Sequence, residues 1–185
     1  MYKKIILASA ILAATVGVAA ASAPAPYVGA GLGITNNSVT FNDAKTGGAY
    51  RGVPLNVFVG YGGVLSSNFY LAGELSGTIT TANISDNTGL KTSYGMGASV
   101  LPGFMLNDST LAYARVGVVR SHFTDSAFGN TNGAQFGLGM QTSVTQNLDV
   151  RGEYDFVAYK AEKFLGTSVA PRSDQFTVGL VYKIG

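Results

Sequence analysis

Charged or polar and apolar side chains alternate without a break along the segment from Asn147 to Phe156. In an extended chain successive side chains point to opposite faces, so this alternation places all the charges on one face. The charged face consists of Asp149, Arg151, Glu153 and Asp155. The other face is apolar and aromatic, with Gly152 as its one small member. The period of two predicts a β-strand, but the strand alone leaves open whether its apolar face meets a protein core or lipid.

The same period recurs along the rest of the chain, and no stretch shows the period of a helix. In most segments the face opposite the apolar residues carries glycine and small polar residues, as the interior of a narrow barrel requires. The fifth segment is apolar on both faces, and only Arg115 indicates its inner side. The eight predicted strands are Val28–Ile34, Gly52–Gly62, Phe69–Ile79, Lys91–Val100, Leu111–Ser121, Gln135–Val144, Asn147–Phe156 and Gln175–Ile184.

The connections between these segments alternate in length. Short connections are predicted at 63–67, 107–109 and 145–147, and longer polar ones at 36–50, 81–89, 124–132 and 161–172. Short turns at one rim and long loops at the other are typical of outer-membrane barrels. An apolar band ~25 Å tall takes about ten residues of a strand tilted by ~40°, which matches the segments.

Aromatic residues support the barrel in lipid. One predicted girdle, near the short turns, consists of Tyr61, Phe69, Phe104 and Tyr182. The other, near the long loops, consists of Tyr94, Phe136, Tyr154, Phe156 and Phe176. The alternative is a soluble β-sandwich or lipocalin-type barrel, which does not predict two aromatic bands. We therefore predict an all-β fold, an antiparallel up-and-down eight-stranded transmembrane β-barrel.

The N-terminal residues 1–23 have the pattern of a secretory signal peptide. Lys3 and Lys4 precede an alanine-rich apolar run that ends in small residues. The alternatives are cleavage after Ala20 or Ala21, or an uncleaved anchor, for which the run is short. We expect the barrel domain to span residues 24–185. Without Lys3 and Lys4 the formal charge falls from +2 to zero, so composition gives no support for a nucleic-acid partner, and the absence of cysteine excludes thiolate chemistry.

Three short motifs lie at 113–117, in the segment from Asn147 to Phe156 around 151–154, and at 178–185. They resemble the OmpA-like and OmpX-like eight-stranded outer-membrane barrels. The resemblance implies a small monomeric barrel in the outer membrane of a Gram-negative bacterium, inserted by the outer-membrane assembly machinery, with a polar plugged interior and exposed loops. Two departures stand out: the chain ends on Ile184 and Gly185 instead of an outward aromatic, and Leu101 and Gln141 occupy positions where the family has charges.

An inward-facing charged network is the main candidate site, because Arg or Lys on the lipid side near mid-membrane costs roughly 2–4 kcal/mol. Its predicted members are Glu74, Lys91, Arg115, Arg151, Glu153 and Asp155. We interpret it as a structural plug, with a gate for a narrow ion channel as the alternative. A general acid–base pair of Glu74 and Glu153 is disfavoured, because eight strands leave little room for a substrate.

Outer basic residues form a second candidate site, for lipopolysaccharide phosphates. They are Arg51, Arg120, Lys160, Lys163 and Arg172. Ser121 and His122 raise the hypothesis of a lipopolysaccharide-modifying enzyme, but adjacent strand residues face opposite ways. We expect no catalytic residues, no cofactor and no metal. The predicted role is structural, in outer-membrane integrity and in loop-mediated contact with a host or other surface ligand.

Overall fold

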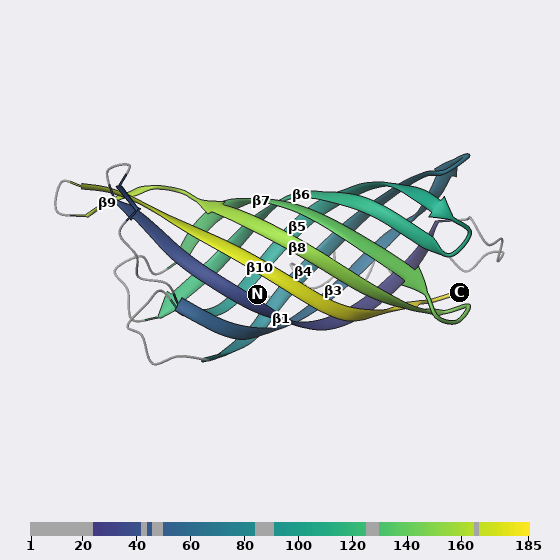
Figure 1. Cartoon of the computed structure of the whole chain (residues 1–185), viewed down its shortest axis with the longest axis horizontal. Helices are drawn as coiled ribbons and strands as arrows, with labels where there is room; N and C mark the ends of the chain where they lie inside the picture. The colour runs from purple at the N-terminus through teal and green to yellow at the C-terminus, as the bar shows by residue number, and fades with distance from the viewer. Residues whose placement is uncertain (1–23, 42–43, 46–49, 84–90, 125–129, 165–166) are drawn as a thin grey trace, which may run out of the picture.

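The chain forms a closed antiparallel β-barrel with its strands inclined to the long axis (Figure 1). The computed structural model describes residues 24–41, 44–45, 50–83, 91–124, 130–164 and 167–185. The strands are β1 Ala25–Phe41, β2 Ala44–Lys45, β3 Tyr50–Ser66, β4 Phe69–Asn83, β5 Lys91–Asn107, β6 Thr110–Thr124, β7 Asn130–Ser143, β8 Leu148–Tyr159, β9 Glu162–Phe164 and β10 Thr167–Lys183. The eight long strands confirm the predicted number, and β2 and β9 are short additions beside β1 and β10.

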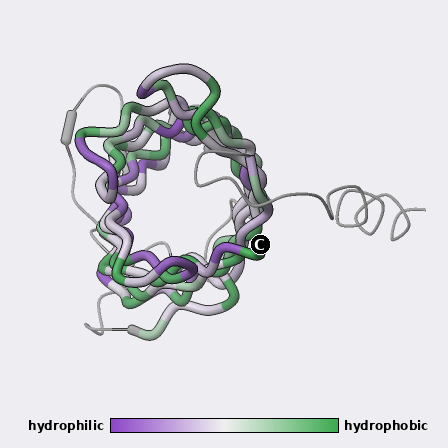
Figure 2. Tube along the Cα trace, turned by 90° about the vertical axis from the view of Figure 1, so that its right-hand side faces the viewer, coloured by the Kyte–Doolittle hydropathy of each residue, from purple (hydrophilic) through white to green (hydrophobic). Residues whose placement is uncertain are grey.

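Pairing between the first and last strands closes the barrel. Each long strand pairs with its sequence neighbour, and β1 also pairs with β10, from Tyr27 opposite Lys183 to Phe41 opposite Val169. Viewed along the long axis, the trace forms a ring around the interior (Figure 2). No long strand therefore has a free edge over its paired length, which removes the exposed ladder groups of an open sheet.

Around the middle of the barrel the outer face is apolar and the charged side chains point inward. Leu138, Met96 and Val118 are 70%, 66% and 65% exposed, whereas Glu74 and Arg115 are each 3% exposed. The predicted faces are confirmed along β8, where Asp149 to Asp155 alternate between buried charge and outward apolar residue. Arg115 points inward on β6, as its charge requires. The described residues include no helix long and apolar enough to cross a membrane.

The strands run farther than the sequence predicted at the long-loop end, the end that holds the connections after β1, β4, β6 and β8. The predicted loops at 36–50 and 161–172 are wrong in part, since β1 continues to Phe41 and β10 begins at Thr167. At the opposite short-turn end, the turn predicted from Gly63 narrows to Ser67 and Asn68, because β3 reaches Ser66. A strand of 17 residues tilted by ~40° climbs about 44 Å, well beyond an apolar band of ~25 Å.

The predicted girdle residues all lie on the outer face. Phe69 and Phe104 contact edge to face at the short-turn end, with ring centroids 5.6 Å apart. Phe176 begins the outward apolar row of β10 at its long-loop end, because the next outward residue is Asp174. The signal peptide predicted at residues 1–23 lies outside the described residues and stays a prediction.

Candidate functional site

Five of the six predicted lumenal charges meet in the middle of the barrel. Arg115 of β6 is their centre. Its Nη2 donates to Glu74 Oε1 at 2.5 Å and to Glu153 Oε2 at 3.0 Å, and its Nε lies 3.6 Å from Asp155 Oδ1. Strands β4, β6 and β8 thus place three carboxylates around one guanidinium. Because all four side chains are nearly inaccessible to water, their pairing offsets the large cost of burying charge.

Glu74 joins this group to a second cation. Its Oε2 accepts from Arg151 Nη1 at 2.6 Å and from the hydroxyl of Tyr27 at 3.0 Å. Arg151 Nε donates to Gln141 Oε1 at 2.9 Å, and Gln141 Nε2 donates to Asp149 Oδ2 at 2.6 Å. The network therefore extends from β4 across β8 to β7, with an amide as one of its links. We call Glu74, Arg115, Arg151, Glu153 and Asp155 the ionic network.

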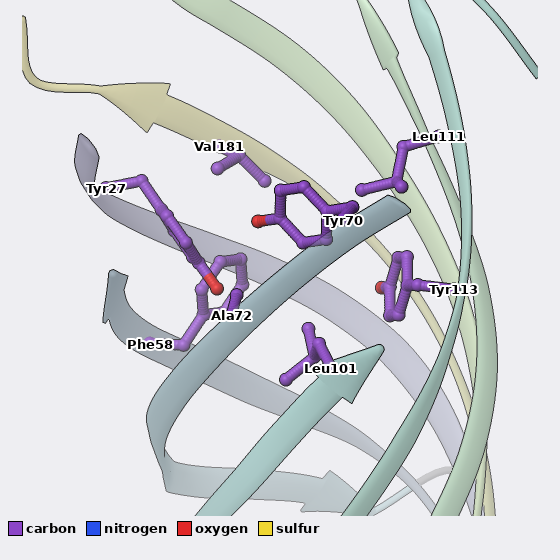
Figure 3. Close-up of a cluster of buried hydrophobic side chains, with 8 residues drawn as sticks. All are labelled: Tyr27, Phe58, Tyr70, Ala72, Leu101, Leu111, Tyr113 and Val181. Carbon is purple, nitrogen blue, oxygen red and sulfur yellow. The ribbon is translucent and has the colours of Figure 1, made fainter. Parts of the chain in front are cut away.

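An apolar cluster fills the interior on the short-turn side of the ionic network. The cluster side chains come from six strands and point toward one another (Figure 3). They are Tyr27, Phe58, Tyr70, Ala72, Leu101, Leu111, Tyr113 and Val181. Arg151 lies against this cluster, with its Cζ 4.4 Å from the ring centroid of Phe58, within cation–π range. The apolar cluster shares this half of the barrel with Asp149 and Lys183, so the polar interior implied by the family resemblance is wrong only in part.

Glycines on the inner face make room for the aromatic rings. A Cβ atom on Gly139 would lie 2.3 Å from Cζ of Tyr113, whose hydroxyl donates to Glu153. We expect Gly139→Ala to lower the free energy of unfolding by about 1–3 kcal/mol, because the ring must leave its place beside Glu153. The measurement is urea unfolding of the barrel in lipid vesicles. Gly152→Ala is the matched control, since nothing lies within 4 Å of its added Cβ. Equal stability of the two variants would contradict the packing argument.

A polar cavity occupies the other half of the interior. Its volume is about 90 Å³, and its lining runs from the ionic network to Thr35, Thr92 and Ser173 toward the long-loop end. Asp155 Oδ1 and Arg115 Nε, at its boundary, have no hydrogen-bond partner among the described residues. A polar cavity of this size can hold several water molecules that complete those bonds.

Sequence reasoning missed several members of the site. It omitted Asp149 from the network, although the alternation placed Asp149 on the charged face; Asp149 Oδ1 lies 3.0 Å from Lys183 Nζ. Gln141, noted only as a missing charge, bonds both Arg151 and Asp149. Tyr27 and Tyr113 occupy inward positions in the alternation, which was a signal for the aromatic rings of the apolar cluster. The side chain of the sixth predicted member, Lys91, lies outside what the structure describes.

Comparison with known proteins identifies the fold. A family model described as the outer membrane protein beta-barrel domain matches residues 6–183. The chain belongs to this family. Neisserial surface protein A has a similar structure, with a TM-score of 0.57 and 18% identity over 88% of this chain and 99% of that one. No curated protein sequence matches the chain.

Two further solved barrels resemble this outer-membrane barrel more weakly. Ail of Yersinia pestis, solved in complex with the heparin analogue sucrose octasulfate, has a TM-score of 0.48 and 15% identity over 86% of this chain and 99% of that one. OprG of Pseudomonas aeruginosa has a TM-score of 0.46 and 12% identity over 88% and 97%. The family places the protein in the outer membrane of a Gram-negative bacterium. The long-loop end is then extracellular and the short-turn end periplasmic.

Four of the five predicted basic residues of the outer-membrane barrel lie on its outer face at the extracellular end. Arg51, Arg120, Lys160 and Arg172 are exposed. Toward the extracellular end, each follows the last outward apolar residue either directly or after one further outward residue. On β10, for example, Asp174 lies between Phe176 and Arg172 in the outward row. Lys163 belongs to β9, and its side chain is outside what the structure describes. The four described cations form a rim, which we call the basic rim.

Ser121 and His122 do not form a nucleophile and base pair in this outer-membrane barrel. Ser121 points inward, and its Oγ lies 2.9 Å from the hydroxyl of Tyr159. His122 is on the outer face, where its ring stacks on Tyr94 with centroids 4.9 Å apart. The prediction that the two side chains face opposite ways is confirmed, and this geometry offers no activated serine.

Proposed function

We propose that the protein is a structural outer-membrane barrel with a closed lumen that stabilises the outer membrane and presents its long loops at the cell surface. The observation that carries this proposal is the stacking of two layers inside the barrel. The ionic network spans the middle, and the apolar cluster lies beneath it with Leu101 and Val181 fully buried. Together they leave little room for a solute, because the interior of an eight-stranded barrel is only wide enough to be filled by side chains.

The alternative is a narrow gated ion channel, and one observation favours it. The polar cavity already reaches from the extracellular half down to Arg115 and Asp155. Among the described residues, the ionic network, the apolar cluster and the Asp149–Lys183 ion pair then separate it from the periplasm. If Arg115 and Arg151 exchanged carboxylate partners, the network could open a path for small ions.

Single-channel recording in planar bilayers tests the closed lumen. We expect the refolded wild-type barrel to show no steady openings, because the apolar cluster excludes hydrated ions. The channel alternative predicts steady openings that Arg151→Ala or Glu74→Ala abolishes. Such openings, dependent on these two residues, would contradict the closed lumen.

The basic rim supports a second part of the proposal, contact with lipopolysaccharide. Its cations lie just beyond the outward apolar residues, at the height of lipid headgroups on the extracellular side. Charge-assisted hydrogen bonds from Arg and Lys to phosphate are among the stronger polar contacts in proteins. We also propose that the long loops contact a surface ligand. The loop residues 42–43, 46–49, 84–90, 125–129 and 165–166 lie outside the described residues.

A further inference from the structure

A groove crosses the outer face of the barrel below the basic rim. It has a volume of about 840 Å³ and lies over β4, β5, β6, β7 and β8. A cross-strand row of three alanines and Val118 runs along it, because Ala98 pairs with Val118, Val118 with Ala134, and Ala134 with Ala158. Met96, which is 66% exposed, stands along one edge. The groove is therefore apolar and open toward lipid.

Two cations border the groove on its extracellular side. Arg120 pairs with Asn132 across β6 and β7, and the backbone nitrogen of Lys160 donates to the Asn132 carbonyl at 2.9 Å. Neighbouring strands are ~4.8 Å apart, so the Cα atoms of Arg120 and Lys160 are separated by about 10 Å. Their long side chains can reach one phosphate between them. In the part of the chain that the structure describes, no carboxylate lines the groove.

The position of the groove selects its occupant. The row from Ala98 to Ala158 lies among the outward apolar residues, and Arg120 and Lys160 belong to the basic rim at the extracellular end. That leaflet of a Gram-negative outer membrane consists of lipopolysaccharide, whose lipid A part joins phosphates to acyl chains. We propose that the groove holds one acyl chain of lipid A while Arg120 and Lys160 bind a lipid A phosphate. This inference rests on the proposed contact of the basic rim with lipopolysaccharide, and it adds a defined site with a defined lipid.

Native mass spectrometry of the folded full chain in detergent micelles tests this site. The probes are bisphosphorylated lipid A, the same lipid A after phosphatase treatment, and phosphatidylglycerol. We expect one bisphosphorylated lipid A per barrel. Affinity should fall roughly tenfold, a loss of about 1.4 kcal/mol, in the variant that joins Arg120→Gln to Lys160→Gln. The variant that joins Ala134→Leu to Ala158→Leu fills the groove and should weaken binding by a similar factor.

A control variant separates the groove from general changes in volume. Ala30→Leu enlarges an outward alanine on β1 that is exposed and does not line the groove. We expect this control to bind lipid A like the wild type. Unchanged binding of lipid A by the variant that joins Ala134→Leu to Ala158→Leu would overturn the groove as the site of the acyl chain. Equal binding of phosphatidylglycerol or of dephosphorylated lipid A would overturn the assignment to lipid A phosphate.

A separate readout distinguishes failure of this site from failure of the proposed rim contact. A variant with glutamine in place of Arg51, Arg120, Lys160, Lys163 and Arg172 should make cells more sensitive to polymyxin or detergent. If this variant loses the barrier while both groove variants bind normally, the groove inference fails and the rim proposal stands. If the barrier is unchanged while the groove variants lose lipid A, the rim proposal fails and the lipid site stands.

Discussion

Arg115→Met is expected to lower the free energy of unfolding by about 3–5 kcal/mol, the range found when one partner of a buried ion pair is removed. Arg115 lies within 4 Å of Glu74, Glu153 and Asp155. Without its guanidinium, Glu153 and Asp155 have no cation that close among the described residues, and the three carboxylates face one remaining cation, Arg151. The expected loss therefore comes from stranded charge, because methionine keeps most of the side-chain volume.

Urea unfolding in lipid vesicles, followed by the heat-dependent shift of the folded barrel on gels, measures this effect. Arg120→Met is the matched control, since Arg120 lies on the same strand but points outward and is exposed. A double variant that adds Glu153→Gln should recover part of the lost stability, because one stranded charge is removed. If Arg115→Met and Arg120→Met were equally stable, the ionic network would contribute little to the fold.

The alternation of side chains along each strand was enough to predict which charged side chains face the lumen. The alternation in β8 placed Arg151, Glu153 and Asp155 on one face, and Arg115 alone fixed the side of a strand that is apolar on both faces. Membrane burial explains why this worked, because lipid penalises a misplaced charge and so keeps the pattern strict. Predicting the membrane and the barrel needed no knowledge of contacts.

The partners within the lumen could not be predicted in the same way. Glu74 and Arg151 are 77 residues apart, and only the stagger of strands in the closed barrel brings them together. The strand ends were also missed. Beyond the apolar band both faces are polar, as in Asn36 and Asn37 of β1, so hydropathy gives no alternation there even though the backbone ladder continues.

Leu138→Arg is expected to destabilise the barrel by about 2–4 kcal/mol in lipid vesicles, the cost of a cation on the lipid face near the bilayer midplane. Leu138 lies near the middle of the outward apolar row of β7 and is 70% exposed. In a soluble protein, a leucine this exposed could be replaced by arginine with almost no loss of stability. The size of the loss therefore reports whether lipid or water surrounds the barrel.

Val144→Arg provides the matched control for this membrane test. Val144 lies in the short connection after β7 and is 59% exposed, so it differs from Leu138 in depth and not in chemistry. Near the interface the same substitution should cost only about 0–1 kcal/mol. A comparison of urea unfolding for the two variants then isolates depth in the bilayer as the variable. Equal costs would mean that the exposed apolar row of β7 does not face lipid, and the placement of the basic rim and its lipid groove at the extracellular leaflet would lose its physical basis.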